Sequence, residues 1–85
     1  MYLHIGKKII LKTKDIIGIF DINIQKSKEI SNIVGQLAEK NQITDVSDGI
    51  KKSLILIKDG NIVKGYLSNI SSVTLAKRAE ENKIK

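Results

Sequence analysis

The sequence contains no cysteine, no proline and no tryptophan in its 85 residues. Without cysteine, a disulfide framework and a thiolate zinc site are both impossible, and the single histidine cannot form a histidine-rich metal site. No apolar run approaches the roughly 18 residues that a membrane span requires, and the N-terminus lacks the basic-then-apolar layout of a signal peptide. We therefore expect a cytoplasmic protein with no metal site and no membrane association.

Patterns that mark enzymes are also missing. The glycines are scattered singly, so the phosphate-binding loops of the Walker and Rossmann kinds are absent. The titratable side chains that could do acid–base work show no recognised catalytic spacing; they are His4, Asp15, Asp21, Asp45, Asp48 and Lys52. We expect a protein that is not an enzyme, with no cofactor and no small-molecule substrate.

Positive charge is what the sequence has in excess. Lysine and arginine number 15 against 9 acidic residues, which gives a net charge of +6 and a pI near 9.7. A field of this sign favours polyanions such as nucleic acid, although a lysine-rich solubilising surface is the simpler reading. With only two tyrosines and one phenylalanine, the chain lacks the aromatic platform on which single strands stack. Contact with the backbone of duplex DNA therefore fits better.

The chain is expected to form a single domain over residues 1–85, because this length buries only about 60–65% of the surface that the unfolded chain exposes. Residues 2–5 predict a short strand ended by Gly6, and residues 8–12 predict a second strand with Ile9 and Leu11 on one face. Residues 15–24 are apolar on both faces, which predicts a central strand covered on both sides.

Residues 27–40 carry the clearest helical pattern, with apolar side chains forming one stripe at Ile30, Ile33, Val34, Leu37 and Ala38. Ser27 is the expected N-cap, and Asn41 is expected to end the helix in the left-handed conformation. Gly35 costs about 1 kcal/mol relative to alanine inside a helix, so either packing holds this helix or a close neighbour needs the space.

After a polar stretch at residues 44–52, the apolar run at 53–57 predicts a second covered strand, and the turn at 59–61 predicts a hairpin with residues 62–67. Ser71 is the expected N-cap of the last helix, with Ile70 and Leu75 at the hydrophobic-staple positions. Residues 80–85 are expected to fray. The predicted fold is α+β: a small, twisted, largely antiparallel sheet with two helices, in ββαββα-like order with an extra N-terminal strand.

Six basic residues are candidates for DNA contact. Lys51 and Lys52 follow a glycine at the mouth of a strand, where two cations can reach a phosphate while the sheet holds their backbones. The other candidates lie around the second turn and on the last helix, at Lys12, Lys14, Lys77 and Arg78. For each of these groups the alternative is an ordinary solvated surface.

Four segments, taken in order, resemble one known family. They are MYLHIG at 1–6, TKDIIGIFD at 13–21, DVSDG at 45–49 leading to KS at 52–53, and LSNISS at 67–72 leading through TL at 74–75 to KRA at 77–79. These segments resemble the RemA/RemB extracellular matrix regulators of Firmicutes, and the opening is similar to that of RemB-type members.

The resemblance implies a fold related to LytTR-type DNA-binding domains, assembly into closed rings, and transcription regulation of biofilm-matrix genes through DNA bound around the ring. The DNA-contacting arginines of RemA correspond here to Asp15, Ile50 and Lys51, with Lys14 and Lys52 beside them. We therefore expect a ring-forming DNA-binding regulator. The alternative, favoured by Asp15 and Ile50, is a structural or protein-interaction ring that does not contact DNA.

A homo-oligomer is also expected from the strands themselves. Two strands are apolar on both faces, and only two short helices with narrow apolar stripes are available to cover them. A closed ring of subunits would bury the apolar surface that a monomer leaves exposed to water.

Overall fold

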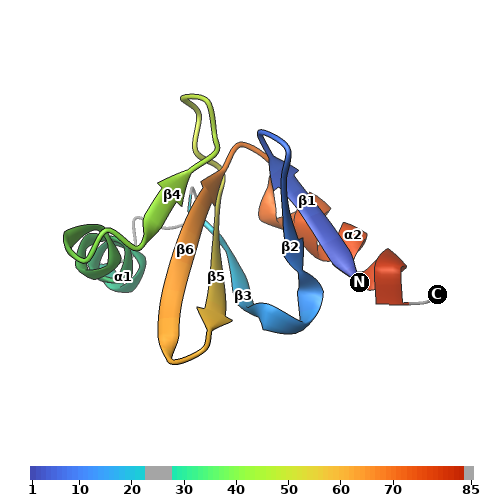
Figure 1. The fold of residues 1–85 in the computed structure, drawn as a ribbon. Helices are drawn as coiled ribbons and strands as arrows, with labels where there is room; N and C mark the ends of the chain where they lie inside the picture. The colour runs from blue at the N-terminus through green and yellow to red at the C-terminus, as the bar shows by residue number, and fades with distance from the viewer. Residues whose placement is uncertain (23–27, 84–85) are drawn as a thin grey trace.

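The computed structural model describes residues 1–22 and 28–83. In chain order the elements are β1 (Tyr2–Gly6), β2 (Ile9–Lys12), the short 3-10 helix η1 (Thr13–Asp15), β3 (Ile16–Asp21), α1 (Lys28–Glu39), β4 (Ile43–Asp45), β5 (Ser53–Asp59), β6 (Ile62–Ser68) and α2 (Ser72–Lys83) (Figure 1). The predicted α+β class with two helices and mostly antiparallel strands is confirmed.

The strands form two sheets, whereas the sequence predicted one. β1 and β2 make a separate antiparallel hairpin, and the larger sheet has the order β3-β5-β6-β4. β5 lies at the centre of the larger sheet and is antiparallel to both of its neighbours, while β4 runs parallel to β6. The predicted turn at residues 59–61 joins β5 to β6 as a hairpin, which is confirmed.

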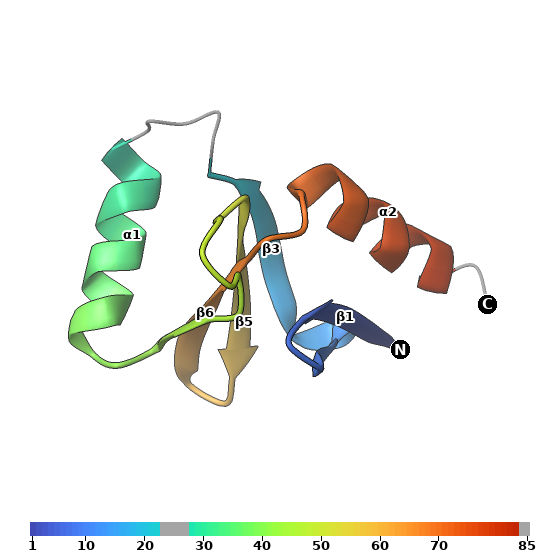
Figure 2. The same ribbon diagram turned by 90° about the horizontal axis from the view of Figure 1, so that it is seen from above.

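The larger sheet is covered on both faces, as Figure 2 shows with α1 on one side and α2 and the β1–β2 hairpin on the other. Alternation along β5 divides its apolar residues between two clusters. Ile55 and Ile57 pack with Leu3, Ile5 and Leu75 from the hairpin and α2. Leu54 and Leu56 pack with Leu37 of α1 and Leu67 of β6 on the other face.

The prediction of a central strand at residues 15–24 is wrong in its position. β3 covers Ile16–Asp21 and pairs with β5 alone in the described part of the chain, so it is an edge strand. Its two apolar faces are explained by the two clusters, because Ile19 packs in one and Phe20 in the other. Apolar residues on both faces of a strand therefore indicate that other elements cover both faces of the sheet, and they do not indicate how many strands lie beside that strand.

The sequence analysis missed β4, because two of its three residues fall in the polar stretch that begins at residue 44. Only Ile43 of this strand is apolar and partly buried, so its pattern was too short to stand out. Its pairing with β6 is extended by two backbone hydrogen bonds, from Gly65 N–H to the Gln42 carbonyl (2.9 Å) and from Val46 N–H to the Leu67 carbonyl (2.8 Å).

The helix signals are largely confirmed. Asn41 has φ 57° and ends α1 in the left-handed conformation, while the predicted cap Ser27 lies outside the described residues. The Ser71 hydroxyl accepts a hydrogen bond from Thr74 N–H at 3.2 Å, as expected of the N-cap of α2. Ile70 and Leu75 pack in the same cluster, and α2 continues to Lys83. None of the helices described is long and apolar enough to cross a membrane.

Candidate nucleic-acid interface

The loop between β4 and β5, residues 46–52, carries the Lys51 and Lys52 pair. Its last residue is held from both sides: Lys52 N–H donates to the Ser68 carbonyl at 2.8 Å, and Ile22 N–H donates to the Lys52 carbonyl at 3.1 Å. The next residue, Ser53, is fully buried and donates its hydroxyl proton to the Ile70 carbonyl at 2.8 Å. The exposed Lys52 side chain therefore extends from a fixed backbone at the edge of the core.

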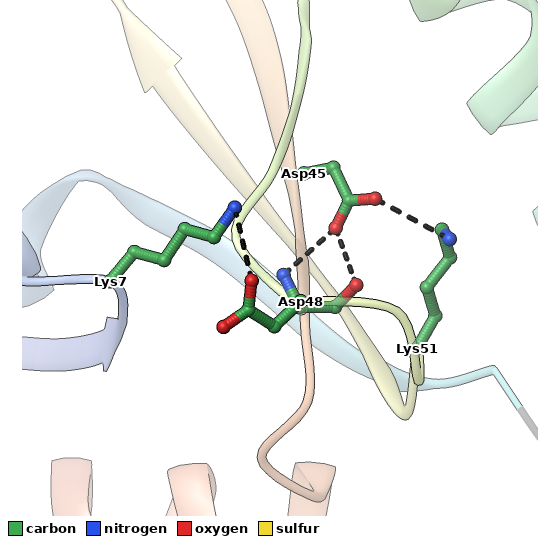
Figure 3. A network of polar contacts seen from close by, with 5 residues as sticks. Lys7, Asp45, Asp48 and Lys51 are labelled. Carbon is green, nitrogen blue, oxygen red and sulfur yellow. Dashed lines mark hydrogen bonds and ion pairs between the residues drawn. The ribbon is translucent and has the colours of Figure 1, made fainter.

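Asp45 organises the first half of this loop (Figure 3). Its Oδ1 atom accepts hydrogen bonds from the Ser47 hydroxyl and from Ser47 N–H, the latter at 2.8 Å. Its Oδ2 atom lies 3.4 Å from Lys51 Nζ. The Ser47 hydrogen bonds, with a smaller contribution from Lys51, lower the pKa of Asp45 from 3.8 to about 2. The carboxylate is therefore ionised near neutral pH and partly offsets the charge of Lys51.

A second ion pair ties the loop to the turn between β1 and β2. Lys7 Nζ, in that turn, lies 3.5 Å from Asp48 Oδ1 in the loop (Figure 3). Asp48 and Gly49 adopt φ values of 58° and 115°, a left-handed stretch that is costly for Asp48 and easy for glycine. The loop therefore presents both acidic and basic side chains, and each aspartate is paired with a lysine.

The six predicted DNA contacts do not gather in one place. Ile16 pairs with Ile57 and Asp21 with Ser53, so η1 with Lys14 and the loop with Lys52 lie at opposite ends of β5, about 20 Å apart. In Figure 1 the β4–β5 loop and the β1–β2 turn project from the same end of the molecule, away from the β5–β6 turn.

The other candidate residues occupy two further places. Lys12 and Lys14 line a shallow pocket of about 600 Å³ together with Met1, Tyr2 and Thr13. Lys77 and Arg78 are exposed on α2. Of the positions that the resemblance aligns with DNA-contacting arginines, Asp15 is partly buried in η1 and Ile50 is 70% exposed in the β4–β5 loop.

Lys7 and Lys8 were not among the predicted candidates, although both are exposed at the same end of the molecule as Lys51 and Lys52. The sequence carried only part of the signal for this turn, because Lys8 falls inside the predicted strand at residues 8–12 and Lys7 alone precedes it. In the structure β2 begins at Ile9, so both lysines form the turn. Within residues 1–22 and 28–83, no group of three or more histidine, aspartate or glutamate side chains is placed to hold a metal ion.

Comparison with known proteins gives two matches that cover nearly the whole chain. A family model described as "RemA-like: Extracellular matrix regulatory protein A-like" matches residues 2–79. The chain is also 31% identical over 80 residues to Extracellular matrix regulatory protein B of Bacillus subtilis (strain 168), an alignment that covers 94% of this chain and 91% of that protein.

Proposed function

The chain belongs to the RemA-like family of extracellular matrix regulatory proteins, and on that premise we propose that it is a ring-forming, DNA-binding transcriptional regulator. The names of the family and of the matched relative indicate extracellular matrix regulation. Under this proposal the protein acts in the cytoplasm on genes for a biofilm matrix. Its ligand is the phosphate backbone of duplex DNA.

The observation that carries the proposal is the rigid mounting of Lys52 beside Lys51. Backbone hydrogen bonds fix Lys52 between Ser68 and Ile22, so little backbone freedom is lost when its ammonium group meets a phosphate. Among the described residues, Lys52 has no ion-pair partner, unlike Lys51. Lys52 is therefore the strongest single phosphate ligand on this surface.

Phosphate contact, and not base reading, is the chemistry that this surface supports. Lysine is a point charge without the planar fork that reads guanine edges, and the sequence has a single arginine, Arg78, on α2. Affinity should therefore fall with salt, with a log–log slope of about −0.9 for each phosphate neutralised. Sequence selectivity would come from spaced contacts made by several subunits of a ring.

Exposed apolar side chains support assembly of the ring. Ile17 on the edge strand β3 is 54% exposed, and Ile10 and Val73 are also largely exposed. In the described part of the chain, no strand pairs with the outer edge of β3. A partner subunit that covered this edge would bury apolar surface and satisfy free backbone groups at once.

The test is duplex DNA binding, measured by fluorescence anisotropy across a salt series with the oligomeric mass recorded alongside. Lys51→Glu with Lys52→Glu lowers the charge of each subunit from +6 to +2, since each change removes two units. We expect this variant to lose binding and to keep its oligomeric mass, because both side chains are exposed.

The matched control makes the same charge change elsewhere. Lys40 and Lys58 are exposed, and Lys58 lies toward the Asp59 end of β5, away from the loop. Lys40→Glu with Lys58→Glu should keep most of the affinity. Equal losses in the two variants would show that only net charge matters, and the loop would then have no special role.

The second candidate function is an interaction ring without DNA. It is favoured by Ile50, which is 70% exposed at the loop and has no charge to offer a phosphate. If the wild-type ring does not bind duplex DNA at low salt, this candidate replaces the first.

A further inference from the structure

The β1–β2 turn is held against the β4–β5 loop by two contacts, and a hydrogen bond from β6 to β1 fixes the hairpin beside them. The Ser68 hydroxyl is buried and donates to the Ile5 carbonyl at 2.7 Å. A Cβ atom on Gly6 would lie 2.9 Å from the Val46 carbonyl oxygen, so the close approach of the two backbones requires glycine there. The ion pair between Lys7 and Asp48 is the second contact between the turn and the loop. The turn and the loop thus form one continuous surface.

The conformation of the turn does not explain its two lysines. Lys7 and Lys8 have φ values of 45° and 64°, and they sit alone between the paired residues Gly6 and Ile9. Two central residues with positive φ define a type I′ turn, for which asparagine and glycine are favoured and long side chains are strained. Strained positions of this kind tend to occur where the side chain has a function.

The charges of the turn and the loop agree with a shared role. Four exposed lysines lie at this end of the molecule, Lys7 and Lys8 in the turn and Lys51 and Lys52 in the loop, and we call them the four-lysine surface. Asp48 and Asp45 each pair with one of them, at 3.5 Å and 3.4 Å. Both ion pairs are solvent-exposed, so they are weak and a phosphate can displace the carboxylate.

We propose that Lys7 and Lys8 complete a single phosphate-binding surface with Lys51 and Lys52, and that Asp45 and Asp48 hold two of these lysines until DNA phosphates displace them. The inference rests on the proposed function and extends it to residues outside the loop. It assigns two further contacts with duplex DNA to each subunit. The carboxylates of Asp45 and Asp48 then compete with DNA phosphates for the lysines that they pair with.

The first test replaces Lys7→Asn and Lys8→Gly together. This pair suits a type I′ turn, so the variant should unfold at the same or a higher temperature than the wild type. We expect affinity for duplex DNA to fall about tenfold or more at about 0.1 M salt, and the salt slope to shrink by about 0.9 for each phosphate that the turn no longer neutralises. Lys40→Gln with Lys58→Gln removes the same charge at a distance and should change affinity much less.

The second test changes Asp48→Asn, which keeps the side-chain shape and tolerates the left-handed φ of 58°. The variant should bind duplex DNA more tightly, because Lys7 no longer has to leave a carboxylate. The increase in affinity should be clearly smaller when Lys7→Asn and Lys8→Gly are also present, since the released lysine is then absent.

The outcomes separate this inference from the proposed function. If the turn variant binds as the wild type does with an unchanged salt slope, or if Asp48→Asn raises affinity equally in both backgrounds, the inference is wrong while DNA binding through Lys51 and Lys52 stands. If wild-type protein does not bind duplex DNA at low salt, the proposed function and this inference fall together.

Discussion

Replacing Ser68 with alanine should destabilise the fold more than any other loss of a single hydroxyl, because this side chain joins three parts of the chain. Ser68 is fully buried at the end of β6. Its hydroxyl donates to the Ile5 carbonyl of β1 at 2.7 Å and accepts from Ile70 N–H, just before α2, at 3.0 Å. Ser68→Ala leaves both backbone groups without these partners.

The expected cost follows from the two groups that are left unpaired. A buried donor or acceptor that loses its partner costs about 1–3 kcal/mol, so the two groups left by Ser68→Ala should together cost roughly 2–6 kcal/mol. A domain of 85 residues has a total stability of roughly 4–13 kcal/mol. The loss is therefore a large share of the total, and each kcal/mol of it lowers the thermal midpoint by roughly 4–8 °C.

Urea denaturation followed by circular dichroism measures this cost. All variants are compared at one protein concentration, because the stability of an oligomer depends on its concentration. Ser53→Ala is the matched control, because it also removes a buried hydroxyl but breaks a single hydrogen bond, to the Ile70 carbonyl. It should cost about 1–3 kcal/mol, half of the loss expected for Ser68→Ala. Ser31→Ala, exposed in α1, should instead stabilise the helix slightly, by up to about 0.5 kcal/mol.

We expect the loss of stability to be largest for Ser68→Ala, smaller for Ser53→Ala and absent for Ser31→Ala. A Ser68→Ala protein within about 0.5 kcal/mol of the wild type would mean that water reaches the Ile5 carbonyl and the Ile70 N–H, and that the turn is not fastened by this residue. A Ser53→Ala cost equal to that of Ser68→Ala would mean that counting broken hydrogen bonds does not predict the loss.

Apolar patterning was a good guide to which surfaces are covered and a poor guide to which strands are neighbours. The buried run at residues 53–57 was correctly read as a covered strand, because consecutive apolar residues require protein on both faces. The same reading placed residues 15–24 at the centre of the sheet, whereas β3 is at its edge. Neighbours within a sheet are joined by backbone hydrogen bonds, which leave little trace in the side-chain pattern.

The candidate site was predictable only in part for a related reason. The exposure of Lys51 and Lys52 follows from their place in a polar stretch after glycine, and the structure has both exposed. Their surroundings depend on a loop that brings Asp48 to Lys7, residues far apart in the chain. Such a contact is set by the left-handed turn at Asp48 and Gly49 and by the packing of Gly6, and neither appears in a charge pattern.

Three further predictions concern pH, helix stability and assembly. The pKa of Asp45 in the folded protein, about 2, is below its ordinary value of 3.8. Its ionised form therefore stabilises the fold above about pH 4, and this contribution is lost as the pH falls toward 2. Asp45→Asn should reduce the loss of stability between pH 4 and pH 2, as measured by equilibrium unfolding. Gly35→Ala should stabilise α1 by about 1 kcal/mol in urea denaturation, because the added Cβ would have nothing within 4 Å in the described chain apart from its chain neighbours and its own helix backbone; a loss of stability would instead indicate a neighbouring subunit there. The protein should be a homo-oligomer, because the edge of β3 and the 54% exposed Ile17 offer a partner both free backbone groups and apolar surface; a monomer mass in sedimentation at micromolar concentration would refute this.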